Sequence, residues 1–248
     1  MIKVGIEASI EMNGVVSHAS ANIDLVNDIY NELFASSPTK VITPIDKVSF
    51  LDSNQNEIYS ITLSSSDFSL DSTNHKLTVS KQFTYTGSSA SVSYIRLLSG
   101  ADIYFIASVS TNLYSGKTYT LKITISINHS ITSISPSTAT ISCGGFLNDI
   151  LKALYLAQAS RPGLTFIRAD WGATVSDLRL SQTLTNDSTN RKTYHTSVSF
   201  TSGGSLRYIY VYYSGTPTGE PTITIDLGAT YTVTTSDTAD FSWSISVT

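Results

Sequence analysis

The sequence has one cysteine, few charges and no long apolar run, and each shortage excludes a class of protein. Cys143 has no second cysteine to pair with, which excludes an intrachain disulfide framework and a thiolate-caged zinc site. Only 14% of the residues are charged, and Lys and Arg gather in no stretch, so we expect no nucleic-acid partner. No segment approaches the roughly 18 continuous apolar residues of a membrane helix, so we expect no membrane insertion.

The motifs of common enzyme classes are also missing. The sequence contains no Gly-rich phosphate loop and no G-x-S-x-G nucleophile elbow. None of the four histidines lies in a metal-binding spacing, and aspartates such as Asp52 and Asp71 fall in stretches typical of turns. Glu7 and Glu11 would lie about 13 Å apart along one strand, too far for a glycosidase carboxylate pair. The sequence therefore predicts no enzymatic activity, no cofactor and no metal. The missing carboxylate pair also argues against a hydrolase of the β-sandwich type.

Serine and threonine are abundant, with 73 of the 248 residues, and they alternate with apolar residues. At the N-terminus, the residues of one parity are Ile2, Val4, Ile6, Ala8, Ile10 and Met12. The other parity is mostly polar, which is the pattern of a half-buried strand. Glu7 and Glu11 interrupt the apolar stretch that a secretory signal needs, so we expect no export signal.

An internal repeat organises the chain. Residues 25–34 reappear as 146–155, with all six apolar positions and an Asn-Asp pair retained. Three further matches keep the same order: 72–76 with 188–192, 97–100 with 212–215, and 116–121 with 228–233. Four matches in order indicate a tandem duplication.

Each copy begins with a helical pattern, near 24–35 and near 145–157, followed by short alternating runs typical of antiparallel strands. In the second copy, two of these runs are expected as separate strands near 221–227 and 229–234. The linker is expected between residues 128 and 140. The pattern predicts an all-β protein with two tandem, jelly-roll-like β-sandwich domains, 1–130 and 131–248, each with one short N-terminal helix.

A row of tyrosines is the best candidate for a functional surface. Tyr208, Tyr210 and Tyr212 would point to one face of a strand, with Ile209 and Val211 on the core face. Such a row can pack against neighbouring strands, be buried against another subunit, or stack on sugar rings. The sequence leaves all three alternatives open.

The duplicated helix-plus-sandwich module resembles, in its architecture, the tandem jelly-roll proteins of virus particles, which include capsid, turret, decoration and tail-adaptor proteins. The resemblance implies a non-enzymatic virion component, of the minor capsid, turret or tail-adaptor kind, that self-associates into a symmetric oligomer and binds other virion proteins. It also implies synthesis in the host cytoplasm without a signal peptide. The alternative is a carbohydrate-binding or adhesin module that contacts a host surface glycan through Tyr208, Tyr210 and Tyr212.

Overall fold

The protein is an all-β sandwich with two short helices, as the sequence predicts. The structure is a computed structural model that describes residues 2–34, 41–131, 136–157, 166–170, 175–179, 183–188, 191–200, 202–212 and 221–247. The first group of elements is β1 (Ile2–Met12), β2 (Val15–Ser20), α1 (Ile23–Phe34), β3 (Lys47–Leu51), β4 (Glu57–Thr62), the 3-10 turn η1 (Ser65–Asp67), β5 (Phe68–Asp71), β6 (Lys76–Thr84), β7 (Ala90–Ser99), β8 (Asp102–Leu113) and β9 (Thr118–Ile131). The second group is β10 (Thr140–Ser142), α2 (Gly144–Ala153), β11 (Phe166–Asp170), β12 (Val175–Arg179), β13 (Thr183–Ser188), β14 (Arg191–Ser199), β15 (Gly204–Tyr212), β16 (Ile223–Val233) and β17 (Thr238–Val247).

Strand alternation builds the core. The six apolar residues of β1 that share one parity are each at most 2% exposed. They lie opposite the apolar parity of β9, for example Ile6 opposite Ile127 and Ile10 opposite Ile123. A slip of β1 by one residue against β9 would turn its whole apolar row to solvent, so this register is strongly specified.

The strand order of the first group recurs in the second. An eight-stranded sheet has the order β13-β14-β17-β1-β9-β6-β5, with β2 paired to β1. Its segment β5-β6-β9 has the counterpart β13-β14-β17 on the other side of β1. The sheet β4-β3-β7-β8 has the counterpart β12-β11-β15-β16, to which β10 is added. The eight-stranded sheet contains strands from both sides of residue 130, so no break between sheets marks the predicted domain boundary. The division into domains at residue 130 stays a prediction.

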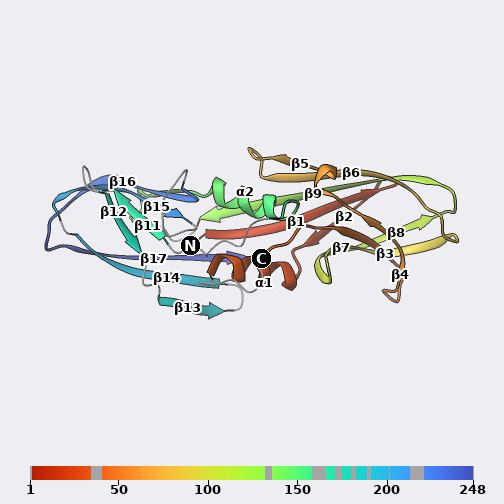
Figure 1. The fold of residues 1–248 in the computed structure, drawn as a ribbon, viewed down its shortest axis with the longest axis horizontal. Helices are drawn as coiled ribbons and strands as arrows, with labels where there is room; N and C mark the ends of the chain where they lie inside the picture. Colours follow the sequence, from red (N-terminus) through yellow and green to blue (C-terminus); the bar gives the residue numbers. More distant parts are fainter. Residues whose placement is uncertain are drawn as a thin grey trace.

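The two smaller sheets lie toward opposite ends of an elongated molecule, and both helices lie near its middle (Figure 1). In the first half the four-stranded sheet packs face to face on the long sheet. Phe50 of β3 and Phe83 of β6 make this contact, with ring centroids 5.1 Å apart.

β1 joins the two halves because it has a partner from each. Along its whole length it pairs antiparallel with β9. Its first residues also pair in parallel with the end of β17, with Ile2 opposite Ile245 and Val4 opposite Val247. Ile2, Val4, Ile245 and Val247 are all buried, so the junction is part of the core.

Each helix contacts the other half as well as its own. The Tyr30 hydroxyl of α1 accepts a hydrogen bond from the Val247 N–H of β17, at 2.9 Å. Just beyond α2, the Leu154 carbonyl accepts one from the Ile45 N–H, at 2.8 Å, and Tyr155 stacks on Phe68 of β5 with centroids 5.8 Å apart. The helices therefore connect the halves on both sides of the β1–β17 junction.

Several local predictions differ from the structure. The short strands β2, β5, β10 and β13 were not expected from the sequence pattern. The two runs near 221–227 and 229–234 form one strand, β16, that continues through a bulge. β9 extends to Ile131, into the segment expected to be the linker, because its pairing with β1 holds it in the sheet.

One of the four sequence matches is wrong as a structural equivalence. Residues 116–121 form the β8–β9 turn and the start of β9, whereas residues 228–233 lie inside β16. The hydrogen bonds identify the true counterpart: the Tyr85 N–H donates to the Lys117 carbonyl (3.0 Å), just as the Phe200 N–H donates to the Asp237 carbonyl (3.1 Å). The start of β9 therefore corresponds to the start of β17.

Candidate functional site

The tyrosine row lies on β15, with its core-facing neighbours as expected. Ile209 and Val211 are buried, while Tyr208 and Tyr210 are partly exposed. Tyr212 is only 8% exposed, so the accessible part of the row consists of two residues rather than three.

Tyr208 and Tyr210 form a stacked aromatic pair beside an ion pair. Their ring planes are inclined by 14° and their centroids are 6.1 Å apart. Arg207 lies 5.2 Å from the Tyr208 ring centre, and its guanidinium donates to both carboxylate oxygens of Asp226, at 3.1 and 3.2 Å. These hydrogen bonds, together with one from the Gly228 N–H, lower the pKa of Asp226. The surface combines aromatic faces with a fixed donor and acceptor pair, which suits contact with a sugar ring or another protein.

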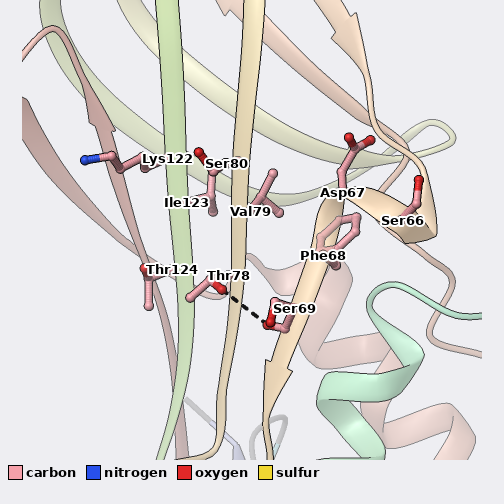
Figure 2. Close-up of a pocket in the computed structure, with 10 residues that line it drawn as sticks. All are labelled: Ser66, Asp67, Phe68, Ser69, Thr78, Val79, Ser80, Lys122, Ile123 and Thr124. Atoms are coloured by element: carbon pink, nitrogen blue, oxygen red, sulfur yellow. Dashed lines mark hydrogen bonds between the residues drawn. The ribbon is translucent and has the colours of Figure 1, made fainter.

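A hollow of about 380 Å³ lies on the polar face of the long sheet, between β5, β6 and β9 (Figure 2). Five of its ten lining residues carry hydroxyl groups, and Thr78 donates a hydrogen bond to the Ser69 carbonyl at 3.3 Å. Asp67 is held by the Lys81 ammonium at 2.7 Å, which lowers the pKa of this carboxyl group. Lys122 lies 3.4 Å from Glu11. The charged groups of the hollow thus make ion pairs that stabilise the sheet surface.

A second hollow, of about 490 Å³, lies at the end of the second half between β15, β16 and β17. Its lining is largely apolar and includes Phe200, Leu206, Leu227, Tyr231, Val233 and Ala239. The carboxylates Asp237 and Asp240 also line it. A hollow of this size and lining is within the range of ligand and side-chain binding pockets.

Aromatic side chains fill the same place in the first half. Tyr119 occupies the position equivalent to Ala239, because both are the second residue of their strand and lie opposite equivalent residues of β6 and β14. It is 7% exposed and stacks on Phe83 at 5.6 Å. Tyr85, equivalent to Phe200, is 2% exposed and meets Tyr59 edge-on at 5.1 Å. The hollow therefore lies where the second half has a methyl group in place of a tyrosine ring.

Two of the histidines, His75 and His129, lie close to each other. His75 is in the β5–β6 turn with a positive φ of 50°, and its Nδ1 lies 2.9 Å from the Asn148 side-chain oxygen of α2. The ring of His129 lies 6.3 Å from that of His75. This pair helps dock α2 on the first half. Across the ranges that the structure describes, no three His, Cys, Asp or Glu side chains gather as a metal site would require.

Aspartates in turns bind the backbone, as the sequence predicts. Asp52 accepts from the N–H groups of Asn54 and Asn56, at 2.8 and 2.9 Å, and Asp71 accepts from the N–H of Asn74 at 3.0 Å. These backbone hydrogen bonds lower the pKa of Asp52. The pKa of Asp71 is lowered first by the Asn74 side-chain amide, which donates to it at 2.7 Å, and then by the Asn74 N–H. The role of both aspartates is to fix turn geometry.

A buried polar cluster under α1 was missed by the sequence reasoning. The Tyr104 hydroxyl donates to Asp28 at 2.8 Å and accepts from the Thr43 N–H at 3.0 Å. Asp28 and Tyr104 are fully buried, and Glu32 is 6% exposed and accepts from the Ile42 N–H at 3.0 Å. The available signal was the position of Asp28 and Glu32 three residues after Leu25 and Ile29 on the apolar stripe of the helix. The cluster anchors α1 to the segment after it and to β8.

Cys143 precedes α2 and is 1% exposed. Burial raises the pKa of its thiol to about 11, so the thiol is protonated at neutral pH and packs as a small apolar side chain.

Within the described part of the chain, neither helix has the length and apolar character needed to cross a bilayer. No protein-family model matches the sequence, and comparison with curated proteins and with solved structures gave no match.

Proposed function

We propose that the chain is a non-enzymatic structural component of a virus particle, of the minor capsid, turret or tail-adaptor kind, that assembles into a symmetric oligomer. The observation that carries the proposal is the joining of two similar sandwich halves by one continuous sheet. β1 pairs with β9 and with β17. Tyr30 of α1 and Tyr155, just beyond α2, each contact the opposite half. Such a connection makes a stiff, elongated unit with surfaces at both ends, which suits a building block.

The ionisable groups have structural roles that are consistent with this proposal. Asp52 and Asp71 fix turns, Asp67 binds Lys81, and Asp28 lies in a buried cluster. The Ser- and Thr-rich strand faces give the unit a polar exterior with little charge.

Two measurements test the proposal. Sedimentation velocity over a concentration series should show a discrete oligomer, and gold-labelled antibody should bind virus particles purified from the organism that carries the gene. A chain that stays monomeric at every concentration, together with unlabelled particles, would contradict the proposal.

The second candidate function is carbohydrate binding at Tyr208 and Tyr210. It is favoured by their nearly parallel, stacked rings next to the Arg207–Asp226 pair. A glycan array should then give a signal that is lost on Tyr208→Ala and on Tyr210→Ala. The matched control is Tyr94→Ala, because Tyr94 of β7 occupies the position equivalent to Tyr208, just after the bulge. Loss of the signal in the control, or no glycan signal at all, would argue against this function.

A further inference from the structure

The two ends of the molecule are built from equivalent turns but differ in shape. The β8–β9 turn lies at one end of the long axis and the β16–β17 turn at the other (Figure 1). At the first end Tyr114 projects, with 54% of its surface exposed. At the second end lies the apolar hollow beside Ala239. One end therefore offers an exposed aromatic side chain, and the other offers an apolar space.

The hollow is suited to an aromatic ring. In the first half the equivalent space holds the ring of Tyr119, which packs on Phe83. The second half has Ala239 at this position, and Phe200 and Leu206 line the space that results. A tyrosine ring that enters from outside would remove apolar surface of both partners from water and would fill the space that Tyr119 fills in the first half.

The charges of the two turns are complementary. Lys117 of the β8–β9 turn has Asp237 as its counterpart in the β16–β17 turn, and Asp240 lies three residues further on. Residues 112–118 include no acidic residue, and residues 232–240 include no basic residue. Opposite charges favour the approach of unlike ends and oppose the approach of like ends.

We propose that the hollow lined by Phe200, Leu206 and Ala239 binds the Tyr114 side chain of a second copy of this chain, with Lys117 of that copy facing Asp237 and Asp240. The inference rests on the proposed assembly function and specifies the surfaces involved. A contact between unlike ends is heterologous, so successive copies form a ring if the rotation closes and a filament if it does not.

Two single substitutions test the contact from opposite sides. Tyr114→Ser removes the side chain that enters, and Ala239→Tyr fills the hollow with the residue that the first half has at this position. In sedimentation velocity, each variant alone should lose the growth in size with concentration, with the dissociation constant raised more than about tenfold. An equimolar mixture keeps one intact Tyr114 and one open hollow, so it should form heterodimers and nothing larger.

Val16→Ser is the matched control for the entering residue. Val16 is also an exposed apolar residue of the first half, at 52%, and lies in β2. This variant should assemble like the unmodified chain. Circular dichroism and thermal unfolding of every variant separate loss of the contact from loss of the fold.

A cysteine pair detects the contact even when it is weak. The double variant Tyr114→Cys with Ala239→Cys should give a ladder of disulfide-linked chains on oxidation, because buried Cys143 does not compete. If the unmodified chain assembles, and Tyr114→Ser and Ala239→Tyr assemble equally well, this contact is refuted and the proposed function is retained. If the chain is monomeric at every concentration and no ladder forms, the proposed assembly function fails with it.

Discussion

Tyr104 illustrates how burial changes the chemistry of a single side chain. Its hydroxyl lies between Asp28 and the Thr43 N–H, and none of its surface is exposed. Burial, reinforced by the Asp28 carboxylate, raises the pKa of Tyr104 to about 12 from its ordinary value of 10. The folded chain therefore keeps a proton, between these two pH values, that the unfolded chain releases.

The stability of the protein should depend on this proton at alkaline pH. Because the pKa is raised in the folded state, the contribution is fully present below pH 10 and is lost as the pH rises to about 12. Between these pH values, the free energy of unfolding of Tyr104→Phe should fall by about 2–3 kcal/mol less than that of the unmodified chain. It should also be less stable at neutral pH by about 1–3 kcal/mol, because the partners of the hydroxyl stay buried.

Urea unfolding at a series of pH values measures both effects. The control is Tyr59→Phe, which removes a hydroxyl that donates to the Thr84 carbonyl at 3.1 Å near the surface. This variant measures the effect of losing a phenol hydroxyl that lies outside the buried cluster. An alkaline fall in Tyr104→Phe equal to that of the unmodified chain would show that the phenol proton does not contribute.

Among the strands, β16 differs from its counterpart β8 by a longer bulge. Gly228 lies in this bulge with a φ of 74°, and the Thr138 hydroxyl donates to the neighbouring Leu227 carbonyl at 2.9 Å. A Cβ atom on Gly228 would lie 2.1 Å from the Thr138 carbonyl oxygen. The absence of a side chain at Gly228 thus allows the backbone at Thr138, just before β10, to pass close to β16.

Two glycine substitutions separate the cost of the backbone angle from that of the close approach. Gly116 has the same φ of 74°, but a Cβ there would meet nothing within 4 Å. Gly116→Ala should lower the free energy of unfolding by about 1–2 kcal/mol, the cost of a left-handed residue. Gly228→Ala should lower it by roughly 3 kcal/mol or more, because the clash with backbone is added. Equal losses, measured by urea unfolding, would show that the segment at Thr138 moves aside freely.

The helices and strands were predictable where the spacing of apolar residues along a short stretch of sequence identifies them. The alternation in β1 and β9 and the apolar stripes of both helices need only neighbouring residues, and the residues of these patterns whose burial is described lie as expected. The second helix, α2, ends at Ala153, earlier than the expected residue 157. The pairing of Ile2 with Ile245 has no local signal, because it depends on the whole chain in between.

The end hollow could not be found from the sequence for a specific reason. The match of 116–121 with 228–233 aligned Tyr119 with Tyr231, whereas strand register aligns Tyr119 with Ala239. A shared Thr-Tyr-Thr sequence thus concealed the loss of an aromatic residue. The tyrosine row was predictable as a face, but the burial of Tyr212 depends on how the sheet packs.

At the scale of the whole molecule, the halves should unfold together. The β1–β17 pairing and the Tyr30–Val247 hydrogen bond connect the halves, and their buried residues form one core cluster. Calorimetry should show a single transition with equal calorimetric and van't Hoff enthalpies. Tyr30→Phe should lower the stability by about 1 kcal/mol and keep one transition, since β1 still joins the halves. Two separate transitions in the unmodified chain would contradict this.

The position of β1 also has a consequence for how the chain reaches its native state. β1 precedes one of its pairing partners, β17, by most of the described chain, so it is synthesised long before β17. Contacts so distant in the chain form slowly, because a large loop must close before they contribute. Any intermediate with a folded first half and an undocked β17 exposes the edge of β1 that β17 covers in the native state, including the Ile2 backbone, while the other edge stays paired with β9. At high chain concentration, β17 of a neighbouring molecule can pair there instead, so that refolding at high concentration favours strand-exchanged dimers over native chains.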